Sequence, residues 1–298
     1  MQARMKDALI VGAGPAGASC ALWLARLGLS PLLADARGQA GGLLNDSPYR
    51  NDWIVTQPGV SGVDLSEGIG LALAAAGVPM LLGARATKAE RIHAGFRVTF
   101  ALAGGEKTVE ASRLVIATGV RARSGGLRPS ERVLVGPGHA VASYDFAGKS
   151  VAILGGGDNA FENYGFAKRG GGREVHIYAR AVRAARMFAN EVAPADLHIG
   201  PFEADDDNIR VNGRPYDVLL VMFGWEPVPV FDADFSFRKD ERGFFQVDFR
   251  TCETNESGIF AIGEATALRH PCVVTAMSDG IAAAKAIQRQ TESRLREP

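Results

Sequence analysis

The chain has 298 residues and a mass of 31.5 kDa, which suits two domains that each bury a core of their own. It carries 33 basic and 33 acidic residues, and this formal net charge of zero argues against nucleic acid or an anionic membrane surface as the partner. The apolar runs are too short to span a membrane, and the three cysteines form neither a CxxC motif nor a disulfide framework. We therefore expect a cytoplasmic protein that acts on a small molecule or on another protein.

The first predicted element is a buried strand at residues 7–11, which leads directly into a G-x-G-x-x-G sequence beginning at Gly12 and then into a helix at about 18–27. In this pattern Gly12 makes the turn, Gly14 lets the backbone approach a pyrophosphate, and Gly17 lets the helix pack on the strand. The N–H groups at the start of the helix then face the anion.

A second strand follows at residues 31–34 and ends at Asp35, 23 positions after Gly12. An acid at this point accepts hydrogen bonds from the ribose hydroxyls of an adenosine. Strand, loop, helix and acid together predict a dinucleotide site. The alternative is a glycine-rich turn in which Asp35 is simply solvated at the end of a strand.

The second half of the chain repeats this pattern. A buried strand at residues 150–154 leads into G-x-G-x-x-A at 155–160, then into a helix that ends near residue 168 and a strand at 174–178. Ala160 takes the place of the third glycine and is small enough for the helix to pack on the strand. The repeat predicts a second nucleotide site.

The end of this last strand lacks the carboxylate that an NAD-binding site would have. Arg180 and Arg183 stand there instead, with Arg186 shortly after. Guanidinium groups bind a 2′-phosphate bidentately, so the sequence favours NADP(H) over NAD(H). The alternative is that these arginines form a solvated helix face. His176, inside the strand, is expected to be a packed histidine rather than a catalytic one.

Three further segments make a family resemblance specific. Residues 113–119 are an apolar strand that ends in Ala-Thr-Gly, residues 218–227 are a strand with a G-x-x-P exit, and residues 243–264 end in Gly263 and Glu264. Together with the two glycine loops, these segments resemble the low-molecular-weight thioredoxin reductases along nearly the full length of the chain.

The chain departs from this family at several positions. Glu264 stands where the family usually has an Asp that binds the ribityl chain of FAD, and a carboxylate one methylene longer still accepts such a bond. Gly41 and Gly42, and the stretch 57–59 that begins with Gln57, are similar to the family's flavin-contacting G-G and N-x-P-G stretches. FAD binding is expected despite these departures.

The resemblance implies an α/β fold with two Rossmann-like, three-layer nucleotide-binding domains. It implies an FAD domain made of residues 1–118 and 243–298, an NAD(P)H domain inserted at 119–242, and a homodimer through the FAD domains. The residues that the resemblance and the motifs assign to FAD are Gly12, Gly14, Pro15, Ala16, Gly17, Asp35, Gly41, Gly42, Gln57, Ala117, Thr118, Gly119, Gly263, Glu264, Cys272 and Val273. Those assigned to NADPH are Gly155, Gly157, Asp158, Asn159, Ala160, Arg180 and Arg183.

The redox dithiol of the family lies just before the strand of the second glycine loop. By count this place corresponds to residues 138–141, which contain no cysteine. Two thiols that form and break a local disulfide are needed to pass electrons from the flavin to thioredoxin, so activity by that route is not expected.

Other side chains are candidates for a role beside the flavin. Cys272 corresponds to the start of the last helix, expected at about 272–288, where the helix N-terminus would favour a thiolate. The alternative is that Cys272 is a small buried side chain. His139 and His270 are further candidates for proton donation, although a loop histidine is commonly just exposed. The remaining cysteines, Cys20 and Cys252, are expected to be structural.

The sequence therefore predicts an NADPH-dependent FAD oxidoreductase in which hydride passes to the flavin and electrons leave it directly for an outside acceptor. Candidate acceptors are a small electron-carrier protein, a quinone-like molecule and oxygen, and no metal is expected. Two alternatives remain: a flavin-binding redox sensor or partner protein without turnover, and an oxygen-using FAD oxidase with a vestigial NAD(P)H site.

Overall fold

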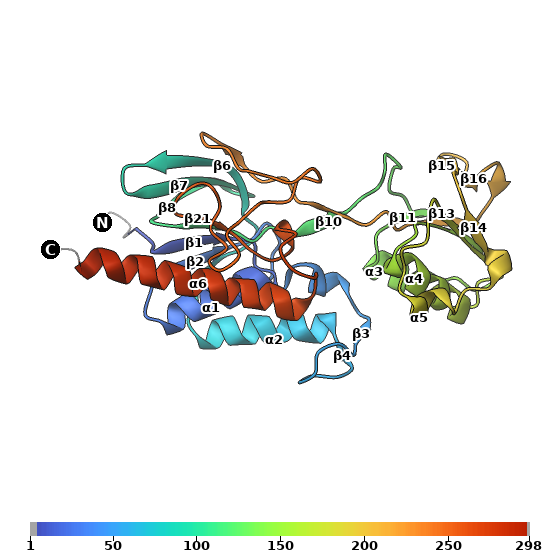
Figure 1. Cartoon of the computed structure of the whole chain (residues 1–298), viewed down its shortest axis with the longest axis horizontal. Helices are drawn as coiled ribbons and strands as arrows, with labels where there is room; N and C mark the ends of the chain where they lie inside the picture. Colours follow the sequence, from blue (N-terminus) through green and yellow to red (C-terminus); the bar gives the residue numbers. More distant parts are fainter. Residues whose placement is uncertain (1–4, 297–298) are drawn as a thin grey trace. The chain divides into compact units, whose positions relative to one another are not determined.

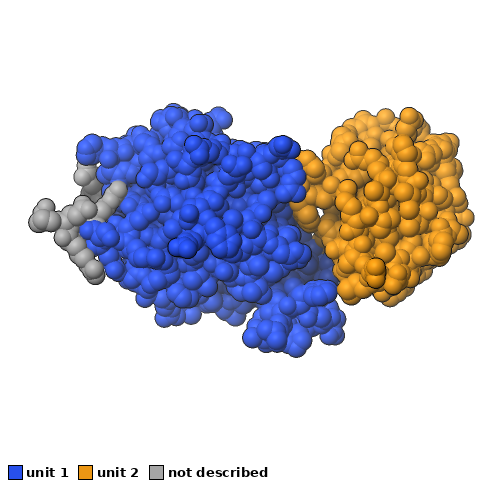
Figure 2. Space-filling model, viewed as in Figure 1, with its two compact units in different colours: residues 1–120, 227–298 blue, residues 121–226 orange. Residues whose placement is uncertain are grey.

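The computed structural model describes residues 5–296, and it separates into two compact units (Figure 2). The first unit combines the chain up to Val120 with the chain from Pro227 onward, and the second unit is Arg121–Glu226. One unit is therefore inserted in the sequence of the other.

The first unit is built on a parallel sheet with helices on one face and a second, mostly antiparallel sheet on the other (Figure 1). Its elements are β1 (Ala8–Val11), α1 (Pro15–Arg26), β2 (Pro31–Ala34), η1 (Gly42–Asp46), β3 (Arg50–Asn51), β4 (Val60–Ser61), α2 (Gly62–Ala75), β5 (Met80–Leu81), β6 (Arg85–Ile92), β7 (Gly95–Leu102), β8 (Gly105–Ala111), β9 (Leu114–Ile116), β20 (Asp232–Ala233), β21 (Ile259–Ala261), η3 (Gly263–Ala265) and α6 (Val273–Arg296).

The parallel sheet has the strand order β21-β9-β1-β2-β5. Helices α1, α2 and α6 form one apolar core against it, which includes Leu24, Leu73 and Ile287. The mixed sheet β20-β6-β7-β8, in which β20 runs parallel to β6 and the other pairs are antiparallel, forms the other core, which includes Phe96 and Phe100. Because both faces are covered, the central strands are apolar at nearly every position rather than alternating.

The second unit is also built on a parallel sheet. Its elements are β11 (Val133–Val135), α3 (His139–Ala142), β12 (Ser150–Leu154), α4 (Asp158–Arg169), β13 (Glu174–Ala179), α5 (Arg186–Ala189), η2 (Pro194–Asp196), β14 (Leu197–Ile199), β15 (Ala204–Asp205), β16 (Arg210–Val211), β17 (Arg214–Pro215) and β18 (Val218–Val221). The order of the main sheet is β11-β18-β12-β13-β14, with α4 packed against β12 and β13.

Two short strands carry the chain between the units. These strands, β10 (Val120–Ala122) and β19 (Trp225–Pro227), pair with each other. Hydrogen bonds flank the pair, from the N–H of Arg123 to the carbonyl of Gly224 (2.9 Å) and from the N–H of Val228 to the carbonyl of Gly119 (3.0 Å).

The second boundary of the inserted unit lies at residue 226, whereas the sequence predicts an insert of residues 119–242 that ends 16 residues later. Residues 227–242 pack with the first unit because β20 pairs with β6, and Phe231 is buried in the core of the same sheet. The first boundary, at residue 120, lies within two residues of the expected one.

Two helices differ in extent from their expected ranges. Helix α1 begins at Pro15 rather than near residue 18, because a proline at the first helical position needs no hydrogen-bond acceptor. Helix α6 covers Val273–Arg296 and is longer than the expected 272–288, since neither glycine nor proline interrupts the sequence between 288 and 296. Within residues 5–296, no helix combines the length and the apolar character needed to cross a membrane.

Candidate nucleotide-binding sites

The predicted FAD residues of the first unit gather at one edge of its parallel sheet. The loop that begins at Gly12 follows β1, Asp35 follows β2, Thr118 follows β9, and Glu264 follows β21. All four strands are parallel, so their carboxyl ends meet at the same edge. Ligands of open α/β sheets bind at this edge.

The first glycine loop is packed so tightly that two of its glycines cannot be replaced without a collision. A Cβ atom on Gly12, whose φ is +112°, would collide with the carbonyl oxygen of Ala117, and a Cβ on Gly17 would collide with the carbonyl oxygen of Gly12. Gly14 differs, because its Cβ would meet only the Cα of Gly42, at 3.8 Å. Gly14 also precedes α1, which has no side-chain cap at this end. The open position is therefore the one expected to face a pyrophosphate.

Asp35 is oriented toward the glycine loop by its own hydrogen bonds. Its Oδ2 accepts from the backbone N–H of Ala13 (2.6 Å), and its Oδ1 accepts from that of Arg37 (2.7 Å). The N–H of Gly41 donates to the carbonyl of Ala13 (2.8 Å), which joins the Gly41-Gly42 turn to the same loop. The structure thus brings three separate sequence motifs together at the ends of β1 and β2.

Two polar groups at this edge lack a partner that would satisfy them. The hydroxyl of Thr118 is buried, and among the described residues its Oγ1 finds no hydrogen-bond partner. Glu264 makes no hydrogen bond to the described side chains, and burial raises the pKa of its carboxyl above the usual value. A buried polar group without a partner indicates a ligand or water that would supply one. The edge therefore fits the hydroxyl-rich and phosphate-rich body of FAD.

Other predicted FAD residues take less direct places. Gly263 has a φ of +65°, and its Cβ would lie 2.8 Å from that of Ala16, so the start of η3 touches α1. Gln57 is exposed on the connection between β3 and β4, and within residues 5–296 we find no hydrogen bond from it to the glycine loop. Val273 is the first residue of α6 and is partly exposed.

Cys272 lies just before α6 and caps it together with Thr275. The N–H of Thr275 donates to Sγ of Cys272 (3.5 Å), and the N–H of Cys272 donates to Oγ1 of Thr275 (3.3 Å). This reciprocal pattern is that of a capping box. Pro271 therefore precedes the cap, and the helix itself begins at Val273. Capping is a structural role that the sequence spacing of Cys272 and Thr275 already contained.

The second glycine loop repeats the geometry of the first. A Cβ on Gly155, whose φ is +151°, would collide with the carbonyl oxygen of Met222, whereas a Cβ on Gly157 would meet nothing within 4 Å. Gly157 precedes α4, which again has no side-chain cap. Ala160 is fully buried in the core against the sheet. The open glycine thus occupies the same place in both loops.

The chain after β13 folds back onto the second glycine loop. Oδ1 of Asp158 accepts from the N–H of Ala185 (2.7 Å), and the N–H of Arg183 donates to the carbonyl of Gly156 (2.6 Å). Asn159 accepts from the amide of Asn163 with its backbone carbonyl. Asp158 therefore holds the arginine-bearing segment in place, a role that spacing alone did not reveal.

A cleft of about 650 Å³ opens beside this loop within the second unit. Arg180 and Arg183 line it, and among the described residues neither guanidinium group has an acceptor or an ion-pair partner. The sequence predictions missed the other members of the lining. These are Arg123, Ser124, Gly125, Gly126, Gly156, Ala179, Ala181, Phe202, Phe223 and Glu226, beside the predicted Gly155.

The histidine candidates do not gain catalytic features from the structure. His139 is exposed at the start of α3, with its Nδ1 3.3 Å from the hydroxyl of Ser143, and His270 is exposed before α6. His176 is buried in β13, as expected, and its Nδ1 lies 2.9 Å from the hydroxyl of Tyr216. Burial lowers the pKa of His176 below the usual value, so the ring is neutral at pH 7.

No cysteine pair takes the place of the missing dithiol. The second unit contains no cysteine, and α3 covers most of the expected dithiol segment. Cys20 and Cys252 are fully buried in the helix-side core of the first unit. Burial raises the pKa of Cys252 to about 12 and raises that of Cys20 as well, so both are neutral thiols.

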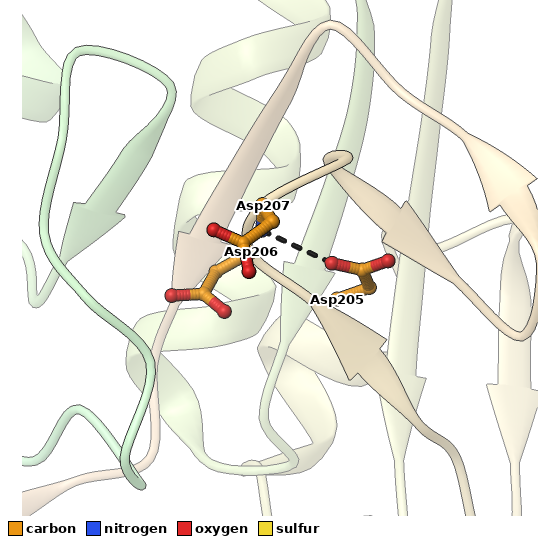
Figure 3. Close-up of side chains that lie close together, drawn as sticks. All are labelled: Asp205, Asp206 and Asp207. Carbon is orange, nitrogen blue, oxygen red and sulfur yellow. Dashed lines mark hydrogen bonds between the residues drawn. The ribbon is translucent and has the colours of Figure 1, made fainter.

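Three consecutive aspartates in the second unit lie close together in one acidic turn (Figure 3). Other protein groups bind these carboxylates. Carboxylate oxygens of Asp205, Asp206 and Asp207 lie within 4.8 Å of one another. Arg128 binds two of the three, with its Nε 3.0 Å from Asp206 and its Nη2 against Asp207, and Asn208 donates to Asp205 (2.8 Å). The cluster therefore anchors the turn between β15 and β16 to the segment that carries Arg128.

The chain has two parallel sheets, and in each a central strand, β1 or β12, leads into a glycine loop with one open glycine. This arrangement is that of the oxidoreductases that bind FAD and a pyridine nucleotide. The model of the pyridine nucleotide-disulphide oxidoreductase family matches residues 6–198, and the chain belongs to this family. Members of the family typically bind FAD and NAD(P)H. Within it the chain is of the thioredoxin reductase-like type, without a cysteine pair in the described structure.

Relatives with two different names cover nearly the whole chain. It is 30% identical over 328 residues to a ferredoxin–NADP reductase of Gluconacetobacter diazotrophicus (94% of this chain, 90% of that one). It is 26% identical over 316 residues to a thioredoxin reductase of Streptomyces coelicolor (94% and 92%). The thioredoxin reductase structure of Lactococcus lactis matches with a TM-score of 0.80 at 23% identity (97% and 99%), which shows a shared fold.

Proposed function

We propose that this protein is an NADPH-dependent FAD oxidoreductase whose reduced flavin passes electrons directly to an external acceptor. The observation that carries this proposal is the pair of glycine loops in two separate units, each with one open glycine at the uncapped start of a helix. Two dinucleotides are then held by one chain, and the unit with the second loop contains no thiol to act between them.

The first unit is proposed as the FAD domain. Gly14 and the start of α1 would hold the pyrophosphate, and Asp35 the adenosine ribose. The buried, unsatisfied hydroxyl of Thr118 and the partly buried carboxyl of Glu264, which has no hydrogen-bond partner among the described side chains, would bond the rest of the cofactor. When bound, FAD supplies the chemistry of accepting hydride and of passing electrons on.

The second unit is proposed as the NADPH domain. Gly157 and the start of α4 would hold the pyrophosphate, and Arg180 and Arg183 would hold the 2′-phosphate at the end of β13. The guanidinium groups line the cleft and have no acceptor in the described structure, so they are available to a phosphate ligand. The competing alternative is that they are simply solvated. Aromatic rings of Phe202 and Phe223 in the same cleft offer faces for a base.

The external acceptor is proposed to be a one-electron carrier protein of the ferredoxin class. Relatives named ferredoxin–NADP reductase match at 30% and 28% identity over most of this chain. A carrier that takes electrons from the flavin itself needs no thiol relay, and the second unit has none to offer. A quinone-like molecule and oxygen are the competing acceptors.

The test is anaerobic stopped-flow reduction of the purified protein by stoichiometric NADPH and, separately, NADH. We expect the yellow flavin to bleach faster with NADPH, and the reduced protein then to be reoxidised by ferredoxin but not by thioredoxin. Flavin that stays oxidised with both nucleotides would show a sensor rather than a reductase. Steady peroxide production without NADPH would show an oxidase, and a colourless protein that cannot be reconstituted with FAD would remove the basis of the proposal.

The homodimer and the cytoplasmic location stay predictions. Size-exclusion chromatography with light scattering of the FAD-loaded protein measures the first directly.

A further inference from the structure

The cleft of the second unit has a charged wall that the proposed NADPH contacts do not use. Arg123 and Glu226 line the same cleft as Arg180 and Arg183, although Arg123 directly follows β10 and Glu226 lies within β19. These four are the charged residues of the lining. Three guanidinium groups against one carboxylate leave a formal charge of +2, which balances the charge of a phosphate monoester near pH 7.

Glu226 is shared unequally between two arginines. Its Oε1 accepts a hydrogen bond from Nε of Arg121 at 2.7 Å. Its Oε2 lies 3.7 Å from Nε of Arg123, an ion-pair distance that is too long for a hydrogen bond. Arg123 is therefore held near the carboxylate by charge alone, and its fork of N–H donors remains available to a stronger acceptor.

The backbone of Arg123 is fixed while its side chain is not. Its N–H donates to the carbonyl of Gly224. The chain at Gly125 packs closely against the ring of Phe223, which a Cβ on this glycine would approach to 2.7 Å. Roughly half of the Arg123 side chain is exposed, at 46%. A side chain on a preorganised backbone loses less freedom when it binds a ligand.

We propose that Arg123 is a third guanidinium ligand of the adenosine 2′-phosphate, and that Glu226 sets the selectivity for this phosphate by competing for Arg123. The inference rests on the proposed NADPH site of the second unit. A nucleotide with a free 2′-hydroxyl cannot draw Arg123 from Glu226, so it gains nothing from this residue. A 2′-phosphate must displace the carboxylate, which makes Glu226 a brake on affinity and Arg123 the source of discrimination.

The experiment is isothermal titration of the FAD-loaded protein with adenosine 2′,5′-bisphosphate and with adenosine 5′-monophosphate. We expect Arg123→Gln to weaken binding of the bisphosphate by roughly ten- to a hundredfold and to leave binding of the monophosphate within about twofold. Glu226→Gln is expected to tighten binding of the bisphosphate by roughly three- to tenfold. Arg210→Gln removes the same charge from a residue that does not line the cleft and serves as the matched control.

The double variant Arg123→Gln/Glu226→Gln gives the sharpest result. If Glu226 acts through Arg123, its substitution has no effect on the bisphosphate once Arg123 is gone, so the two changes are strongly non-additive. Additive effects would overturn the competition, and an Arg123→Gln variant that behaves like Arg210→Gln would overturn the contact itself. Circular dichroism of each variant checks the fold, and Glu226→Gln provides a gain that misfolding cannot imitate.

Failure of this inference is distinguishable from failure of the proposed function. Wild-type protein that binds both probes equally overturns the role of Arg123, yet its flavin can still be reduced by NADPH or NADH in the stopped-flow test. If wild-type protein prefers the bisphosphate but its flavin is not reduced, the role of Arg123 is supported and the proposed reductase function is refuted.

Discussion

The carboxylate of Asp35 accepts a hydrogen bond from the backbone N–H of Ala13 at 2.6 Å, which ties the end of β2 to the glycine loop after β1. The two residues lie 22 positions apart in the sequence, and the bond fixes the acid beside the start of α1. One oxygen of Asp35 thus holds the loop while the carboxylate as a whole faces the edge proposed for FAD.

Substitution of Asp35 is expected to release FAD. Asp35→Ala removes the acceptors of two backbone N–H groups and the proposed ribose contact, and we expect FAD affinity to fall by roughly a hundredfold or more. Asp35→Asn keeps one oxygen and should lose less. The FAD affinity of both variants is measured by equilibrium titration of the apoprotein and by the amount of flavin retained after gel filtration. Equal affinities of Asp35→Ala and the wild type would refute the assigned role of this acid.

The two kinds of glycine in each loop predict opposite phenotypes. Gly14→Ala and Gly157→Ala add a methyl group where the protein has space, so we expect a folded protein whose affinity for FAD or NADPH, respectively, drops roughly tenfold or more. Gly12→Ala and Gly155→Ala force a collision with backbone at positive φ and should cost roughly 3 kcal/mol or more of stability.

Urea unfolding and ligand titration separate these effects. Gly70→Ala, at a position in α2 where an added Cβ meets nothing within 4 Å, serves as the control and should stabilise by about 0.5–1 kcal/mol. If Gly14→Ala unfolds as readily as Gly12→Ala, the open position is needed for folding and not for a ligand.

Cys272 is predicted to act as a helix cap and not as a redox group. Cys272→Ser keeps an acceptor for the N–H of Thr275, so the free energy of unfolding should be unchanged. The rate of flavin reduction should stay within about twofold of wild type. Cys272→Ala removes the cap and should cost roughly 0.5–2 kcal/mol. Thermal unfolding and stopped-flow reduction report these quantities. A loss of turnover in the serine variant, with its fold intact, would instead indicate a thiol in the reaction.

Glu264 is predicted to give the FAD-free protein a characteristic pH dependence. Burial raises the pKa of this carboxyl in the folded state above its ordinary value of 4.5. The folded state therefore binds more protons than the unfolded state between the two pKa values, and its stability falls as the pH rises through that window. Glu264→Gln cannot titrate and should lack this fall.

Urea unfolding of the apoproteins from pH 4 upward measures how the free energy of unfolding changes with pH. The same pH dependence for wild type and Glu264→Gln would contradict the prediction. FAD affinity gives a second readout, because Glu264→Gln loses the charged acceptor and should bind FAD more weakly, whereas Glu264→Asp restores the family's usual residue.

Local sequence patterns predicted the positions of several strands correctly. The strands Pro31–Ala34 and Ser150–Leu154 lie where the apolar runs predicted them, since continuous runs bounded by glycine or acid leave few other structures open. In both glycine loops the first glycine, Gly12 or Gly155, has a positive φ and packs against backbone that directly follows a neighbouring strand. Such patterns are confined to a few consecutive residues, so they can be read without knowledge of the rest of the chain.

Contacts between distant segments were decided only by the tertiary structure. The boundary at residue 226 depends on the pairing of β20 with β6, which lie more than a hundred residues apart. Arg123 and Glu226 meet in one cleft because a different pair of strands, β10 and β19, brings the two ends of the inserted unit together. The sequence by itself thus predicts which residues bind a nucleotide, and the folded chain decides which charges surround them, because electrostatic neighbours depend on distance in space and not on distance along the chain.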